Sequence, residues 1–403
     1  MVRFWLAFAL SVAAVSAAEA DAARILADLR SRHLPYGAIL DPVFRGYDST
    51  EIVGYTRCGD SAIWTGHYLA AEAYRYAVRK SPDSLNGVRV GLEGIQLLVD
   101  VTGTGLLARC AVPADSPHAA ALLGEEQHHG FHHRMLDGAV WVWVGNTSRD
   151  QYLGVFFGLT AVWNLVDDPQ VRDAARGLAT RMLDNLRAHN WAVVMPDGEV
   201  STSFALRADQ QLMLLKLGRR ANEGRFGSDY SWRAAFSSGA TVLPIAAEVM
   251  EPHESYFKFN LDHITFYGLL TGGDSGFVKR NYDRSFAVLR NTLDGHGNAF
   301  FDLIDRAVRG PDAARDAGVV RMLEEWLTRP RRDLWVDRRA EFAACGENRA
   351  CDPLPVPLRV RTDFLWQRSP FQLSGGGPGL IEGPGIDYLL PYWMARYYGI
   401  LSD

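Results

Sequence analysis

Helix-length segments that follow one another in pairs, separated by short turns, dominate this chain and limit the folds it can adopt. Apolar residues recur at helical spacing along each segment, and Pro, Gly or Asp residues mark the turns between them. An antiparallel pair of helices buries only one face, so several pairs must pack against each other. The predicted helices cover residues 22–32, 61–79, 85–101, 151–166, 169–189, 203–221, 231–250, 257–270, 282–293, 298–308, 311–327 and 385–398.

These helices form six pairs when the first and the last are counted together, and a ring of six pairs is an (α/α)6 toroid. We therefore expect an all-α fold with long loops over one end. An open helical array and two separate bundles are the alternatives. No charged or Gly/Ser-rich linker divides the chain, which favours a single toroid domain over residues 21–403. We expect one strand, over residues 139–144, and an irregular tail over residues 331–382, in which the glycine-rich segment 374–379 forms a mobile loop.

The N-terminus has the three parts of a secretory signal peptide over residues 1–20. Arg3 precedes an apolar run over residues 4–15, and Ala18-Glu19-Ala20 has the small-x-small pattern of a cleavage site. The apolar run is too short to span a bilayer well, and no later segment is apolar over a sufficient length. We therefore expect a secreted or periplasmic protein without stable membrane insertion after cleavage.

The four cysteines support export, because an even number in an exported chain favours disulfides. Cys345 and Cys351 are close in the sequence and predict a local disulfide, which leaves Cys58 to pair with Cys110. Zinc binding is the weaker alternative, because the chain has no CxxC or CxxH spacing.

Charge and motifs exclude several classes of function. The net charge is −5, from 42 Lys and Arg against 47 Asp and Glu, so nothing attracts the chain generally to nucleic acid. The motifs GxSxG, HExxH and GxGxxG and the phosphate-binding loop are absent from the sequence. Serine hydrolases, zinc proteases and nucleotide-dependent enzymes therefore have no support here.

Asp60 and Asp150 are the strongest catalytic candidates, because each stands beside the start of a long helix that begins a pair. In a ring of helix pairs, these two starts would open at the same end on neighbouring inner helices. Two carboxyl groups that face a sugar can cleave a glycosidic bond: one donates a proton to the leaving oxygen, and the other activates water or stabilises positive charge. Helix capping is the alternative for each residue, since Asp is a preferred N-cap.

A weak internal repeat connects these helix starts. Residues 60–66 and 262–268 have Asp, an aromatic residue and Gly at the same offsets, and residues 148–154 are a shorter variant. Each segment lies near the start of the first helix of a pair, which supports a ring-like arrangement.

The densest cluster of titratable side chains is His128, His129, His132 and His133. We predict that His129 and His133 assist catalysis, because histidine titrates near neutral pH. A metal site and a solvated loop are the alternatives. The spacing matches no established zinc motif, so we predict neither a metal nor another cofactor.

Further residues are predicted to hold the substrate. Arg149 can clamp the carboxylate or sulfate of an acidic sugar, with an ion pair as the alternative. Trp64 and Tyr152 offer aromatic faces to sugar rings, although aromatic residues at helical spacing also serve as core. The other predicted substrate-binding residues are Asp262, His263, Trp366, Gln367 and Arg368.

The Asp-led helix starts at Asp60 and Asp150, with the aromatic and Gly residues that follow them, resemble those of secreted (α/α)6-toroid carbohydrate-active enzymes, the six-hairpin glycosidase-like group. The resemblance is architectural and covers residues 22–400. It implies a glycan substrate. Glycoside hydrolases of that group use Asp or Glu at the funnel, whereas its polysaccharide lyases use His, Tyr and Arg on uronic acids.

We therefore expect a glycan-active enzyme that takes an oligo- or polysaccharide, first of all a glycoside hydrolase with Asp60 and Asp150 as its acid–base pair. A lyase, in which His or Tyr removes the proton beside a uronate carboxylate, is the second hypothesis. The third is a non-catalytic glycan-binding protein of the cell envelope.

Overall fold

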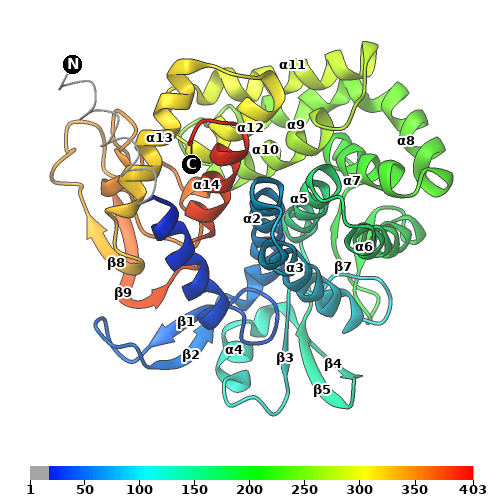
Figure 1. Cartoon of the computed structure of the whole chain (residues 1–403), viewed down its shortest axis with the longest axis horizontal. Coiled ribbons are helices and arrows are strands. Elements are labelled where there is room, and N and C mark those ends of the chain that lie inside the picture. Colours follow the sequence, from blue (N-terminus) through cyan, green and yellow to red (C-terminus); the bar gives the residue numbers. More distant parts are fainter. Residues whose placement is uncertain (1–17, 403) are drawn as a thin grey trace.

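The helices account for most of the chain in the computed structural model, which describes residues 18–402 (Figure 1). Of the predicted signal peptide, residues 1–17 lie outside the described part, and residues 18–20 begin a helix over residues 18–32. No described helix combines the length and the apolar character needed to cross a membrane. The helices that follow are α2 (Ser61–Arg79), α3 (Pro82–Asp100), α4 (Ala119–Glu125), α5 (Arg149–Leu165), α6 (Pro169–Ala188), α7 (Ala208–Ala221), α8 (Glu223–Ser237), α9 (Val242–Glu248), α10 (Tyr256–Leu270), α11 (Gly276–Leu293), α12 (Ala299–Arg309), α13 (Ala313–Leu327) and α14 (Ile386–Tyr397).

The prediction of an all-α (α/α)6 toroid is wrong. The protein is 57% helical, but 13% of it lies in strands that form three sheets, which makes the fold mixed α/β. The physical reason is that the long segments between the helices pair with one another through backbone hydrogen bonds instead of remaining irregular. The predicted helix over residues 231–250 is also interrupted, because the chain forms α8, a short 3-10 turn and α9 there.

The largest sheet pairs strands from opposite ends of the chain. Its order is β2 (Ile52–Thr56), β1 (Asp41–Phe44), β9 (Ser374–Glu382) and β8 (Arg332–Asp337). Val43 pairs with Ile381, and all the pairings are antiparallel. The glycine-rich segment that we expected as a mobile loop is therefore part of a strand. In Figure 1 this sheet lies at the lower left, beside the helices.

Two smaller sheets complete the β structure. The three-stranded sheet has the order β3 (Cys110–Pro113), β5 (Ala139–Val144) and β4 (Phe131–Leu136), and it lies below the helices in Figure 1. The third sheet is the hairpin of β6 (Ala192–Val194) and β7 (Val200–Ser203). Strand β5 has the bounds predicted from its apolar run, and its partners are the elements that the prediction lacks.

The helical core consists of α2, α5, α7, α10, α12 and α14. Contacts link each of these helices to the next, and α14 in turn contacts α2. The second helices of the pairs (α3, α6, α8, α11 and α13) each lie against the first helix of their own pair. Helix α5 is buried on all sides over residues 151–162, as expected for a helix with apolar residues around its whole circumference.

Helices α2 and α5 make the closest helix contact of the site region, and glycine allows it. A Cβ atom on Gly66 would lie 2.1 Å from the carbonyl oxygen of Gly154, and one on Gly154 would lie 2.6 Å from Ile63 Cγ1. These are glycines of the internal repeat, so the repeat marks backbone contact between helices. Because residue 63 lies beside residue 151 and residue 66 beside residue 154, the two helices run parallel and begin at the same end.

Both predicted disulfides are confirmed. Cys58 is bonded to Cys110, and Cys345 is bonded to Cys351. The first bond ties the segment before α2 to strand β3, which fixes the backbone directly before Asp60.

Candidate functional site

Two adjoining cavities, each of about 310 Å³, open where α2, α5, α7 and α10 begin. Asp150 and Phe257 line both of them. Cavity A is also lined by Asp60, Ile63, Trp64, Glu254, Gln367, Arg368, Ser369 and Gln372. Cavity B is also lined by Ser148, Arg149, Thr202, Arg207, Gln210, Glu248, Lys258, Leu261 and Asp262.

Asp60 stands on a segment that is fixed from several sides. The backbone N–H of Gly59 donates to Glu126 Oε1 at 2.9 Å, and Arg109 Nη1 donates to the carbonyl oxygen of Gly59 at 2.8 Å. The Cys58–Cys110 disulfide holds the preceding residue. The backbone therefore presents the Asp60 carboxyl group to cavity A with little freedom to move.

The capping role that Asp favours is not the role of the Asp60 side chain. Asp60 occupies the N-cap position of α2, yet within the described chain its carboxyl group accepts no capping hydrogen bond. Asp168 and Asp312, at the starts of α6 and α13, do cap, because each accepts a backbone N–H at 2.9 Å. Asp150 lies in the first turn of α5, where Ser148 is the N-cap residue. Both carboxyl groups are thus directed to other partners.

One amide group connects the two carboxyl groups. Gln151 Nε2 donates to Asp60 Oδ1 at 3.2 Å and to Asp150 Oδ2 at 3.4 Å. Gln151 is fully buried, and its Oε1 accepts the backbone N–H of Ile63 at 2.9 Å, which fixes the orientation of the amide. The two carboxyl oxygens can be no farther apart than the sum of the two donor distances.

The two carboxyl groups have different surroundings. Burial, followed by the negative charges of Asp363 and Asp150, raises the pKa of Asp60 to about 7. The Asp150 carboxyl group accepts the hydroxyl of Ser148 in addition to the Gln151 amide. Near neutral pH, Asp60 can therefore carry a proton beside a hydrogen-bonded carboxylate.

Asp363 is the buried charge behind Asp60. Burial favours the neutral form of Asp363, but the positive charge of Arg57 and a hydrogen bond from Thr362 hold its pKa below the usual value. Trp64 Nε1 donates to Asp363 Oδ2 at 3.2 Å, one helical turn after Asp60. This contact places the Trp64 ring between the cavity wall and the core, stacked on Phe364 with 5.0 Å between ring centroids.

Cavity B contains a second group of carboxyls, which surround Arg207. The Arg207 guanidinium donates to Asp209 Oδ2 at 2.8 Å, to Glu248 Oε1 at 2.9 Å and to Asp262 Oδ1 at 3.3 Å. Burial, followed by the charge of Glu248, raises the pKa of Asp262 well above its usual value. Burial thus favours the neutral form of Asp262, and the Arg207 guanidinium is occupied by its three carboxyl partners.

The structure brings some predicted substrate-binding residues to the cavities and places others in the core. Arg149, Asp262, Gln367 and Arg368 line the cavities, as does Trp64. The other three are buried and occupied. The Tyr152 hydroxyl accepts the N–H of Leu107, His263 stacks on Phe301 with 3.8 Å between centroids, and Trp366 Nε1 donates to the carbonyl oxygen of Asp387.

The predicted histidines lie outside both cavities. His133 is exposed on β4. His129 Nδ1 lies 2.6 Å from Glu126 Oε2, and Glu126 in turn holds Gly59, so His129 reaches Asp60 only through these two residues. Burial, followed by the charge of Arg109, lowers the pKa of His129.

Glu126, His128 and His129 are the residues that could hold a metal ion. Their ligand atoms all lie within 4.8 Å of one another. The Arg109 cation that acts on His129 also opposes a second cation there. This group is therefore better explained as support for the Gly59 backbone than as a metal centre.

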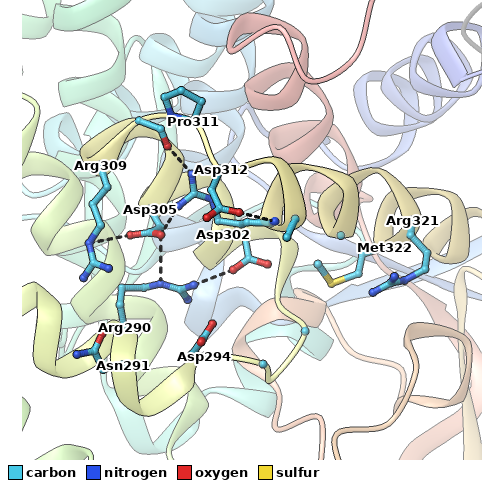
Figure 2. Close-up of a pocket in the computed structure, with 16 residues that line it drawn as sticks. Arg290, Asn291, Asp294, Asp302, Asp305, Arg309, Pro311, Asp312, Arg321 and Met322 are labelled. Carbon is cyan, nitrogen blue, oxygen red and sulfur yellow. Dashed lines mark hydrogen bonds and ion pairs between the residues drawn. The ribbon is translucent and has the colours of Figure 1, made fainter.

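A larger cavity, cavity C, lies elsewhere, between α11, α12 and α13, and has a volume of about 650 Å³. Figure 2 shows Arg290 between Asp302 and Asp305, with Arg309 on the far side of Asp305. Arg290 donates to Asp302 at 2.9 Å, and Arg309 lies 3.1 Å from Asp305. Burial raises the pKa of Asp302 to about 6, although Arg290 opposes the shift. The charges of cavity C thus neutralise one another.

Sequence reasoning missed Gln151, Asp363 and Phe257. Phe257 lines both cavities and is 54% exposed, which gives the site an aromatic face that Tyr152 does not supply. The arrangement as a whole can donate a proton from one carboxyl group and accept a proton at another, across a cavity with polar and aromatic walls. No protein-family model, curated protein or solved structure matches this chain, so these contacts are the basis for interpreting the site.

Proposed function

We propose that this protein is a glycan-active enzyme of the hydrolase type, with Asp60 as general acid and Asp150 as the partner carboxylate. The observation that carries the proposal is the shared Gln151 amide, which holds both carboxyl groups at one cavity junction. The pKa of about 7 for Asp60 supports the assignment of the acid, because a general acid must keep its proton near the working pH.

The chemistry is hydrolysis of a glycosidic bond. Asp60 transfers its proton to the leaving oxygen as the bond from that oxygen to the anomeric carbon breaks. Water adds to the anomeric carbon, and the proton that this water loses goes to a carboxylate of the pair. The Ser148 hydroxyl and the Gln151 amide donate hydrogen bonds to Asp150, which hold its carboxyl group in place.

The walls of the cavities suit a sugar. Gln367, Arg368 and Gln372 offer hydrogen-bonding groups for hydroxyls, and Phe257 offers a ring for the apolar face of a pyranose. Two disulfides are typical of an oxidising compartment, which supports a secreted or periplasmic location for this enzyme.

The decisive experiment incubates the purified protein with a glycan panel and measures both new reducing ends and the absorbance of unsaturated sugars. We expect new reducing ends without unsaturated product. Asp60→Asn and Asp150→Asn should each lower the rate by about 10²- to 10⁴-fold, because each removes a proton-transfer group.

The control is Asp168→Asn, which changes an Asp whose side chain caps a helix. It should lower the melting temperature slightly and leave turnover intact. An unsaturated product would instead support the lyase hypothesis. Unchanged turnover in Asp150→Asn would contradict the proposed role of the pair.

A further inference from the structure

Arg149 is a half-buried cation that lines cavity B, and no carboxylate of the described residues lies within ion-pair distance of it. Within residues 18–402, its side chain donates one hydrogen bond, from Nη1 to the carbonyl oxygen of Ser203 at 3.1 Å. Burial, followed by the charge of Arg207, lowers the pKa of Arg149, which marks a guanidinium that lacks sufficient counter-charge. An uncompensated charge away from water costs free energy, which an anionic ligand would offset.

The carboxylates near Arg149 are already committed to other groups. Asp209, Glu248 and Asp262 all lie within ion-pair distance of Arg207. Asp150 follows Arg149 directly, but its two oxygens accept Ser148 and Gln151. The remaining N–H groups of the Arg149 guanidinium are therefore available to cavity B.

A second cation lies at the edge of the same cavity. Lys258 is half-buried, and its ammonium group lies 6.0 Å from the centroid of Phe257. Arg149 and Lys258 approach cavity B from different helices, α5 and α10. An anion between them would contact the planar guanidinium of Arg149 on one side and the ammonium group of Lys258 on the other.

We propose that cavity B is the subsite for an acidic substituent of the glycan, a uronate carboxylate that pairs with Arg149. This inference rests on the proposed function and names its substrate class. Asp150 lines both cavities, so a sugar that is cleaved between Asp60 and Asp150 can extend its substituent into cavity B. The planar guanidinium can bind a carboxylate through two parallel hydrogen bonds.

The test measures binding first, independently of turnover. Oligosaccharides that contain glucuronate, galacturonate or mannuronate are titrated into the wild-type protein by calorimetry, beside their methyl esters and a sulfated oligosaccharide. We expect at least one uronate oligosaccharide to bind more tightly than its methyl ester. Tighter binding of the sulfated probe alone would assign the subsite to sulfate and overturn the carboxylate assignment.

Arg149→Gln should weaken binding of the acidic probe by about 10- to 100-fold and leave binding of the methyl ester unchanged, as expected for a charge-assisted pair. Arg149→Lys keeps the charge but loses the fork, and should give an intermediate loss. The matched control is Arg321→Gln, which removes the same charge from an exposed position at cavity C. If Arg149→Gln does not fold, Lys258→Gln should still weaken acidic binding about 2- to 5-fold, as expected for a charge that solvent partly screens.

The outcomes separate this inference from the proposed function. Cleavage of neutral glycans by both wild type and Arg149→Gln would keep the hydrolase and overturn the acidic subsite. Arg149-dependent uronate binding without cleavage would keep the subsite and overturn the hydrolase. Equal binding of acid and ester to all variants would overturn the subsite in any case.

Discussion

Cavity C and the pair of cavities A and B are both rich in charge, but they differ in how the charges are partnered. Each of the four arginines of cavity C lies within ion-pair distance of a carboxylate: Arg290 and Asp302, Arg309 and Asp305, Arg315 and Asp305, and Arg321 and Glu325. At cavities A and B, Arg149 has no such partner in the described chain, and Asp60 is held near a second negative charge. The cations of the larger cavity are therefore the better paired ones, and we take unpaired charge, more than volume, as the sign of a ligand site.

The largest effect should come from breaking the network of cavity C. Asp305 is buried and contacts Arg309 and Arg315, so Asp305→Ala removes the carboxylate that these two arginines share. We expect the free energy of unfolding to fall by about 3–5 kcal/mol, measured by urea denaturation. Asp294→Asn, at the same cavity, is the control and should change it by less than about 0.5 kcal/mol. Equal stability of both variants would remove the contrast between the two regions.

The second prediction compares the two disulfides. Cys58 and Cys110 are 52 residues apart, whereas Cys345 and Cys351 are 6 apart. Replacing each pair with Ser should lower the free energy of unfolding by about 4 and about 2 kcal/mol respectively, because the longer loop gains more entropy in the unfolded chain. Turnover at a temperature where both variants are folded sharpens the comparison. It should fall only in the first variant, which releases the segment before Asp60.

The smallest effect is a pH dependence that Asp60 imposes. The folded-state pKa of Asp60, about 7, is above the ordinary value of 3.8. The contribution of Asp60 to the free energy of unfolding is therefore greatest below pH 4 and is lost as the pH rises through 7. Asp60→Asn removes this loss. The variant should match wild type at pH 4 and exceed it by about 2–3 kcal/mol at pH 8, after allowance for solvent screening.

The measurement is the free energy of unfolding of wild type and of Asp60→Asn at pH 4 and at pH 8. Cavity C is the same in both proteins, so the difference reports on Asp60. The same titration should make wild-type turnover fall as the pH passes 7, because Asp60 then loses the proton that it donates. A stability difference that is the same at pH 4 and pH 8 would contradict the raised pKa.

Local signals predicted the helices well. Helix α2 has the predicted bounds, and α6 begins at Pro169 after the capping Asp168, as the sequence indicates. The sheets were missed because their strands are short and pair over long distances: β1 meets β9 through Val43 and Ile381. The hydrophobic pattern of a short strand does not show which distant strand it pairs with, and these two are more than three hundred residues apart.

The site divides in the same way. Asp60 and Asp150 stand out in the sequence because they lie beside helix starts. Gln151 follows Asp150 directly, and this position is the only feature of the sequence that points to it. Asp363 is distant in sequence, and no feature of the sequence points to it, although its charge raises the pKa of Asp60. Tyr152, His263 and Trp366 were predicted from residue type alone, which does not tell a cavity wall from a core.

The contact between Gly66 and Gly154 has a consequence for how this protein can evolve. Even one methyl group at either position would clash with the facing helix and push α2 and α5 apart. It would alter the spacing of Asp60 and Asp150 from a full turn or more away, without touching the cavity itself. The distance between Asp60 and Asp150 thus depends on the absence of side chains at positions 66 and 154. Selection on that distance should act on these two positions, although neither lines the cavities.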